Sequence, residues 1–273
     1  MAKLNYRKFI EENFDIINKD LQRIPFLFNH IQTAYNNALS RRDIILKSRQ
    51  EGFSSLLSAI FTTDFLIRPN SVNVIVADND ENAEILLTKV KLFLNSYETK
   101  NNIKIPLKYN SKTDLTNELA NSTFSIGTAK NTNFGRSRTM TNLLLTEVAR
   151  YPDIEQILAG AGQAVVESGR LILETTANGF NNFKRLWTDS KLGMTGFNPL
   201  FFKASDFYSP EFLAKKKLEL KEYFCQEYPE TDTESFLSSG ECYFDLNKLK
   251  EMYLLCWEPK TDNLIMQTAF NTQ

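Results

Sequence analysis

The feature that most constrains the fold is an alternation of short apolar runs, rich in Ile, Val and Leu, with amphipathic stretches of helical period. This alternation is typical of a mostly parallel β-sheet covered by helices. The expected strands are 43–48, 72–77, 123–128, 143–147, 170–175 and 199–204, and the expected helices are 9–21, 29–39, 54–66, 80–97, 153–161, 179–189 and 210–226. The sequence therefore predicts an α/β fold, with a polar connector over 100–117 and a charged helical segment after Ser209.

Length and composition narrow the classes of protein to consider. A chain of 273 residues, 42% hydrophobic and 24% charged, can bury a sizeable core in one large domain or in one domain with a smaller lobe. No apolar run approaches the roughly 20 residues that span a bilayer, so we expect a soluble, intracellular protein without membrane contact. The net charge of −1 implies that a nucleic-acid partner would be held by a local basic face.

Cysteine and histidine usage excludes several chemistries. Cys225, Cys242 and Cys256 lie far apart, which supports neither a zinc ribbon nor a disulfide framework. The single histidine, His30, argues against Ser-His-Asp and Cys-His catalysis and against histidine-rich metal sites. Carboxylate chemistry remains open.

A strand-to-helix junction follows the apolar run that begins at Ile44. Backbone N–H groups in such a turn point at an anion, Gly52 permits close approach, and the hydroxyl of Ser54 could coordinate magnesium. The segment departs from the G-x-x-x-x-G-K-[ST] phosphate loop, because Ser48 replaces the first glycine and Phe53 replaces the lysine. The alternative is an ordinary strand-to-helix turn in which a serine caps the helix.

Two further strand ends carry polar residues. The strand 143–147 ends in Thr146 and Glu147, and the strand 170–175 leads into Thr176 and an Asn178-Gly179 turn. Ligands of open α/β sheets bind at the carboxyl ends of the strands, so these residues are candidates for a binding site. The alternatives are a glutamate that merely ends a strand and a plain left-handed turn.

Taken in order, these segments resemble the ATPase domain of large terminase subunits, the DNA-packaging motors of tailed bacteriophages. The resemblance covers about 26–245 and implies a RecA-like, ASCE-type P-loop NTPase fold. It implies that Arg49, with Lys47 as the less favoured candidate, stands in for the missing lysine. It also implies Walker A-type phosphate binding by the whole segment Lys47, Ser48, Arg49, Gln50, Glu51, Gly52, Phe53, Ser54 and Ser55.

The resemblance also assigns roles beyond the phosphate loop. Glu147 becomes the general base on the Walker B-type strand, and Ser54 and Thr146 belong to the metal side, although Thr146 lacks the charge of the usual aspartate. The four residues expected to couple hydrolysis to movement are Thr175, Thr176, Asn178 and Gly179.

Two predictions rest on order along the chain, and a third on charge patterning. Gln32 is expected to read the adenine edge with Phe28 near the ring, unless it is simply a glutamine at a helix start. Arg136, or less favourably Arg138, is expected to be an arginine finger acting on a neighbouring subunit, unless both belong to a solvated basic loop. The basic run 215–217 is interpreted as a solvated helix face.

The resemblance implies an ATPase domain over 1–255, with 1–25 and 205–255 contributing a lid, and 256–273 as a linker toward an absent nuclease module. The expected cofactors are ATP and Mg²⁺. The expected partners are double-stranded DNA, a portal protein and a small terminase subunit. The chain is expected to be a monomer in isolation. When assembled on a procapsid in the host cytoplasm, it is expected to form a homo-oligomeric, pentameric ring. The alternatives are a helicase-like or restriction-type DNA translocase and a non-catalytic nucleotide-sensing scaffold that binds DNA.

Overall fold

Eight strands form one mixed sheet in the order β10-β3-β9-β8-β4-β7-β6-β5. The computed structural model describes residues 4–131, 134, 138–237, 248, 251, 252 and 255. The strands of the sheet are β3 (Arg42–Lys47), β4 (Val72–Ala77), β5 (Leu107–Asn110), β6 (Asp114–Asn117), β7 (Ser122–Thr128), β8 (Met140–Thr146), β9 (Val165–Thr175) and β10 (Asn198–Phe202). Strands β10, β3, β9, β8, β4 and β7 are parallel, whereas β6 and β5 extend the sheet in antiparallel fashion.

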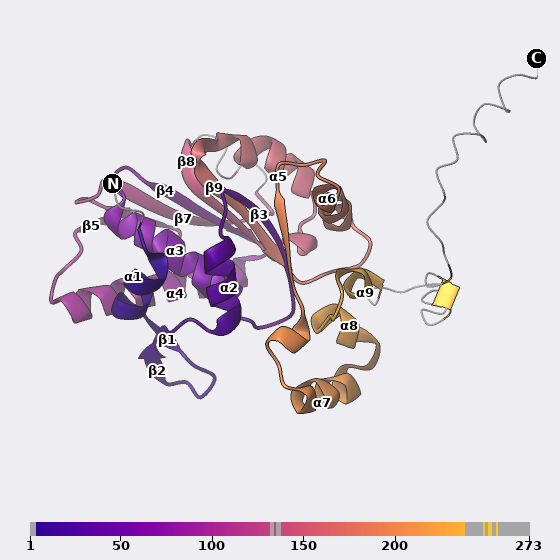
Figure 1. Cartoon of the computed structure of the whole chain (residues 1–273). Helices are drawn as coiled ribbons and strands as arrows, with labels where there is room; N and C mark the ends of the chain where they lie inside the picture. The colour runs from indigo at the N-terminus through magenta and orange to yellow at the C-terminus, as the bar shows by residue number, and fades with distance from the viewer. Residues whose placement is uncertain are drawn as a thin grey trace, which may run out of the picture. The chain divides into compact units, whose positions relative to one another are not determined.

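Helices cover both faces of the sheet (Figure 1). The helices are α1 (Tyr6–Asn13), α2 (His30–Ala38), α3 (Phe53–Ile67), α4 (Asp80–Asn101), α5 (Ile154–Gly160), α6 (Asn182–Lys191), α7 (Pro210–Leu220), α8 (Phe224–Glu227) and α9 (Asp232–Leu237). A short antiparallel ribbon joins β1 (Asp15–Ile17) to β2 (Arg23–Pro25). The predicted α/β, mostly parallel fold is confirmed.

Alternate residues of the central strands enter two different cores. In β3, Ile45 faces the core that α1, α2, α3 and α4 build, whereas Ile44 and Leu46 face the core beneath α5 and α6. This alternation follows from the period of two in a strand. A strand buried on both faces reads as a continuous apolar run, which explains why these strands were visible in the sequence.

Three predicted elements were wrong. The helix expected over 9–21 ends at Asn13, and β1 follows because the buried Phe14 adopts an extended backbone. The connector expected over 100–117 contains the last residues of α4 and the hairpin of β5 and β6. The helix expected over 210–226 is interrupted at Lys221, whose φ of 51° is left-handed, before α8 begins.

The segments proposed as a lid occupy two places. The N-terminal helix α1 packs on α3 and α4, where Ile10 and Phe14 are fully buried. After β10, the chain forms α7, α8 and α9, drawn in orange in Figure 1, and Phe236 of α9 packs against Phe183 of α6. The division into motor, lid and linker stays a prediction.

The strand order places the ends of three strands side by side. Strand β9 lies between β3 and β8, and all three run in the same direction. Lys47, Thr146 and Thr175, the last residues of these strands, therefore lie at one edge of the sheet. This is the carboxyl edge, where ligands of open α/β sheets bind.

Candidate phosphate-binding site

A cavity of about 720 Å³ opens at this carboxyl edge. The predicted phosphate-binding residues Lys47, Arg49, Gln50, Glu51, Gly52, Phe53, Ser54 and Ser55 line it together with Thr146, Glu147 and Thr176. Ser48 is fully buried beneath the loop, where its hydroxyl donates to Glu51 Oε1 at 2.6 Å. The structure thus brings together residues from three segments that are far apart in the sequence.

The loop between β3 and α3 has the backbone of an anion cradle. Gln50 and Gly52 adopt left-handed conformations, with φ of 60° and 85°. A side chain at Gly52 would clash with the Gln32 amide, since a Cβ would lie 2.7 Å from its Nε2. No side chain caps the start of α3, so its first N–H groups remain available to a ligand.

Lys47 is the buried cation of the site. Its Nζ lies 3.4 Å from Glu147 Oε1 and 3.2 Å from Glu174 Oε2. Burial disfavours its charge, but the two carboxylates outweigh that penalty and raise the pKa of Lys47 above its ordinary value. Lys47 is therefore charged and held by two acids.

Arg49 contacts the C-terminal helical segment, which comprises residues 204–237 after β10 and contains α7, α8 and α9. Its guanidinium lies 3.0 Å from Glu227 Oε2, and its backbone N–H donates to the Glu227 carbonyl at 2.9 Å. The hydroxyl of Tyr208 donates to the Arg49 carbonyl at 2.6 Å. With its side chain 54% exposed, Arg49 can exchange partners more easily than Lys47.

Phe53, which replaces the usual lysine, is a core residue. It is 1% exposed and packs against Tyr35 and Phe202, with ring centroids 5.5 and 4.7 Å away. Among the described residues of the loop, the positive charges accordingly come from Lys47 and Arg49, on its β3 side.

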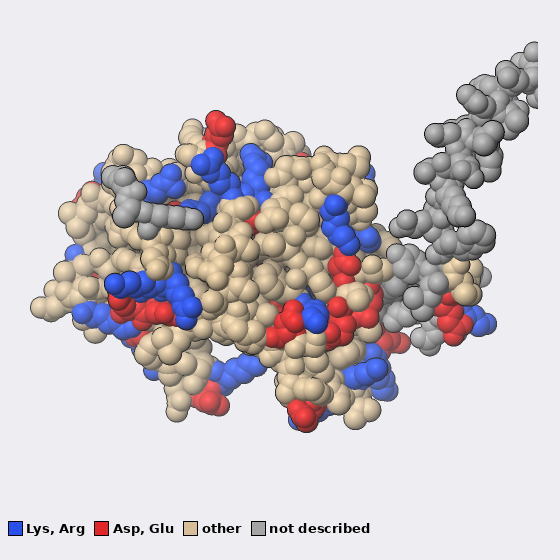
Figure 2. Space-filling view, viewed as in Figure 1, with Lys and Arg blue, Asp and Glu red and all other residues tan. Residues whose placement is uncertain are grey.

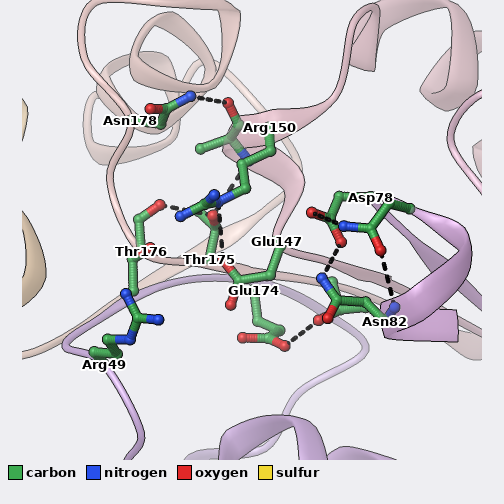
Figure 3. Close-up of polar contacts among 12 residues, drawn as sticks. Arg49, Asp78, Asn82, Glu147, Arg150, Glu174, Thr175, Thr176 and Asn178 are labelled. Carbon is green, nitrogen blue, oxygen red and sulfur yellow. Dashed lines mark hydrogen bonds and ion pairs between the residues drawn. The ribbon is translucent and has the colours of Figure 1, made fainter. Parts of the chain in front are cut away.

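Glu147 follows β8 in a left-handed conformation, with φ 53° and ψ 41°. This conformation turns its carboxylate back over the cavity, where Lys47 contacts one oxygen and Arg150 Nε lies 4.0 Å from the other. Figure 3 shows Glu147 beside Glu174, with Arg49 on one side and Asp78 and Asn82 on the other. A partly exposed carboxylate facing a phosphate loop can accept a proton from a bound water.

Glu174 is fully buried under the cavity. Its Oε1 accepts hydrogen bonds from Ser54 Oγ at 2.7 Å and from Thr146 Oγ1 at 2.5 Å. Burial opposes its ionisation, but Lys47 and these two hydroxyls outweigh the penalty and hold the pKa of Glu174 below its ordinary value.

The pKa of Glu51 is shifted in the opposite direction from that of Glu174. It is 1% exposed, and its Oε2 has no hydrogen-bond partner in the part of the chain that the structure describes. Burial raises its pKa from the ordinary 4.5 to about 8, against the opposing effects of the Ser48 hydroxyl and Lys47. Glu51 is therefore mainly neutral at pH 7, so it adds little negative charge to the loop.

The predicted coupling segment contacts the turn that follows Glu147. The N–H of Ala149 donates to Thr175 Oγ1 at 3.2 Å, and the Asn178 side chain donates to the Ala149 carbonyl at 3.4 Å. Thr175 in turn donates to the carbonyl of Thr176, and Gly179 has a left-handed φ of 70°. A displacement of this segment would therefore move the backbone next to Glu147 (Figure 3).

Of the two predicted adenine-binding residues, Gln32 contacts the phosphate loop and Phe28 lies in the core. Gln32 donates to the Gly52 carbonyl at 3.0 Å and accepts from the Asn29 N–H at 3.1 Å, as part of the capping box of α2. Phe28 is 8% exposed and packs 5.8 Å from Phe26. Their role in adenine binding stays a prediction.

The two arginine-finger candidates differ in what the structure shows. Arg136 lies outside the described residues. Arg138 precedes β8 and therefore lies at the opposite edge of the sheet from Glu147, where it contacts Asp114 and Ser125. From that edge Arg138 cannot reach its own cavity, and a role on a neighbouring subunit stays a prediction.

Sequence reasoning missed several residues around the cavity. Glu174 received no role, although a charge near the end of an apolar strand was a usable signal. Four further polar or charged residues line the cavity: Asp78, Asn82, Lys89 and Arg150. They belong to no sequence motif, so the sequence alone did not indicate that they lie at one site. Within the described ranges, no group of three or more His, Cys, Asp and Glu side chains could hold a metal ion.

Comparison with known proteins shows which solved structures have a similar fold. No protein-family model and no curated protein matches the chain. The mostly parallel sheet has a loop after β3 and an acid, Glu147, after β8, two strands away. This fold is similar to that of the ATPase domains of phage large terminases, which confirms the predicted resemblance at the level of fold.

Three solved structures illustrate the similarity. The large terminase ATPase domain of Thermus phage P74-26 is 20% identical, with a TM-score of 0.59 over 74% of this chain and 93% of that one. The large terminase of bacteriophage HK97 is 16% identical, with a TM-score of 0.60 over 92% of this chain and 51% of that one. The large terminase of another thermophilic bacteriophage, in complex with ATP-γ-S, is 15% identical, with a TM-score of 0.55 over 72% of this chain and 50% of that one. The chain thus spans about half the length of these last two proteins.

Proposed function

We propose that this chain is the ATP-hydrolysing motor of a viral genome-packaging terminase, which moves double-stranded DNA into a procapsid. The observation that carries the proposal is the placement of Glu147 over the phosphate loop, 3.4 Å from the buried amine of Lys47. A base and a phosphate-binding cation at the same cavity are two of the parts that recur in enzymes that hydrolyse ATP. The fold shared with a terminase that was solved both with ATP-γ-S and with ADP supports the choice of nucleotide.

In the proposed mechanism, the nucleotide phosphates lie on the loop 48–52 and the start of α3. Lys47 exchanges Glu147, and Arg49 exchanges Glu227, for phosphate oxygens, which releases Glu147 to orient and deprotonate the attacking water. Thr175, Thr176 and Asn178 then transmit the loss of the γ-phosphate to the turn after Glu147.

The residues present fit a magnesium ion that is held mainly by phosphate and water oxygens. Ser54 and Thr146 both give their hydroxyl hydrogens to Glu174, which leaves oxygen lone pairs for a hard cation or its water shell. When bound, Mg²⁺ would neutralise charge on the β- and γ-phosphates.

The proposal includes partners and a place of action. We propose a homo-oligomeric ring, pentameric when assembled, that contacts a portal protein and a small terminase subunit on a procapsid in the host cytoplasm. Within the described residues, every helix is too short or too polar to cross a membrane. Figure 2 shows basic side chains interspersed with acidic ones on one face of the molecule.

The deciding experiment is phosphate release from ATP, with and without duplex DNA, combined with a strand-separation assay. The motor should hydrolyse ATP slowly as a monomer, accelerate in its assembled form with DNA, and leave the duplex paired. Strand separation would indicate a helicase-like enzyme instead. ATP binding without any phosphate release would indicate the non-catalytic scaffold, which Phe53 and Thr146 make the principal rival.

A further inference from the structure

Glu174 stands out because the proposed mechanism does not use it directly. It is 0% exposed and lies on β9, the strand between the phosphate-loop strand β3 and the base-bearing strand β8. A buried carboxylate is costly unless it is paired and hydrogen-bonded. Glu174 is both, since it contacts one side chain from each of β3, α3 and β8.

The direction of these hydrogen bonds matters. An ionised carboxylate can only accept, so Ser54 and Thr146 must each donate their single hydroxyl hydrogen to Glu174 Oε1. Both residues also line the cavity, whereas Glu174 lies beneath them. Their oxygens are therefore committed as acceptors toward the cavity, as metal ligands are when a carboxylate in the second layer orients them.

Charge supports the same interpretation. On β8, Thr146 stands immediately before Glu147 and lines the cavity, but unlike a carboxylate it carries no charge. The Glu174 carboxylate lies 2.5 Å from the Thr146 hydroxyl, so the missing negative charge is present one strand away. Thr146 and Glu174 are also register partners in the pairing of β8 with β9.

We propose that Glu174 is a positioning residue for Mg²⁺, which orients the Ser54 and Thr146 hydroxyls and supplies from β9 the negative charge that β8 lacks. This inference rests on the proposed function, because it assumes that the cavity binds a nucleotide with magnesium. The competing explanation is that Glu174 only neutralises Lys47 and stabilises the fold.

The test measures the Mg²⁺ concentration needed for tight binding of a fluorescent ADP analogue, together with the binding of the same analogue in EDTA. Glu174→Gln should raise the half-saturating Mg²⁺ concentration about 10- to 100-fold, the usual loss when a second-layer partner is removed. Binding in EDTA should change far less. Mn²⁺ electron paramagnetic resonance provides a second readout, in which the variant should retain less bound ion at equal nucleotide occupancy.

The double variant Thr146→Asp with Glu174→Gln moves the carboxylate back to β8. It should recover most of the Mg²⁺ affinity lost in the single variant, which a purely structural role for Glu174 would not predict. Asp43→Asn is the matched control, because Asp43 is another fully buried acid, at the opposite end of β3. Its Mg²⁺ requirement should equal that of the wild type.

An unchanged Mg²⁺ requirement in folded Glu174→Gln would overturn the inference while leaving the proposed function intact. If that variant does not fold, Glu174→Asp decides, since it keeps a charge near Lys47 but is too short to hold both hydroxyls. It should raise the Mg²⁺ requirement, and wild-type behaviour would overturn the inference. A wild-type chain that binds no nucleotide under any condition would overturn both proposals.

Discussion

The guanidinium of Arg49 lies 3.0 Å from the Glu227 carboxylate, so the exposed cation of the phosphate loop is held by α8 of the C-terminal helical segment. An ion pair in which one side chain is 54% exposed contributes little stability, at most about 1 kcal/mol. Phosphate can therefore compete with Glu227 for Arg49. Nucleotide binding would then loosen one attachment of the segment that contains α7 and α8.

Glu227→Gln should strengthen ATP binding, because it removes both the competing partner of Arg49 and a negative charge at the cavity. About 1 kcal/mol corresponds to a roughly fivefold lower Kd, measurable by isothermal titration calorimetry. Glu219→Gln, which removes an exposed acid on α7 that pairs with Lys216, is the control and should leave the Kd unchanged. Weaker binding in Glu227→Gln would show that Glu227 assists the ligand instead.

Glu147→Gln should lower the rate of ATP hydrolysis by about 10²- to 10⁴-fold, the usual contribution of a general base. ATP binding should persist, because the amide preserves shape and relieves repulsion of the phosphates. Phosphate release and nucleotide binding are measured on the same preparation. The exposed Glu167 on β9 provides the control substitution Glu167→Gln. Full hydrolytic activity in Glu147→Gln would remove Glu147 from the mechanism.

Lys47→Met and Arg49→Met should differ in how much stability each removes. Lys47→Met leaves the buried Glu174 without its cation and should lower the free energy of unfolding by about 3–5 kcal/mol, as measured by urea denaturation. Arg49→Met should cost about 1 kcal/mol or less, because its ion pair is partly exposed. Equal destabilisation by the two substitutions would contradict the assignment of Lys47 as the buried cation that Glu174 requires.

Glu51 gives the fold a pH dependence of definite sign. Because its pKa is about 8 in the folded state and 4.5 ordinarily, the folded state binds the extra proton between these values. The free energy of unfolding should therefore fall, by on the order of a few kcal/mol, as the pH rises through this window. Glu51→Gln should flatten the fall, so that the variant is more stable than the wild type at a pH above the folded-state value. A parallel pH profile in the two proteins would show that Glu51 does not titrate there.

The central sheet was predictable because its strands are buried on both faces. Ile44 and Ile45 enter opposite cores, so the run of apolar residues was unbroken. The edge hairpin was missed for the opposite reason, since β5 is mostly exposed and its sequence, Leu107-Lys-Tyr-Asn, resembles a loop. Its strand character comes from pairing with β6, a tertiary effect that local sequence does not encode.

Site residues at the ends of strands could be predicted from the sequence. Residues that reach the site only through contacts with a neighbouring strand or helix could not. Glu147 and Thr175 were expected at strand ends, and the structure places Glu147 directly after β8 at the cavity and Thr175 as the last residue of β9. Glu174 is one residue short of its strand end, and only the insertion of β9 between β3 and β8 makes it central. The contact of Gln32 with Gly52 likewise depends on how α2 approaches the loop, which no spacing in the sequence specifies.

Because the backbone of Glu147 is left-handed, the residue that would be most stable at position 147 differs from the one that the proposed hydrolysis requires. A residue with a side chain costs about 1–2 kcal/mol more than glycine in this conformation, and asparagine tolerates it better than glutamate does. A library screened only for heat resistance should therefore enrich glycine and asparagine at position 147 and discard the carboxylate. Variants selected in that way would resist heat but would lack the proposed general base. A useful screen must therefore measure ATP hydrolysis as well as thermal stability.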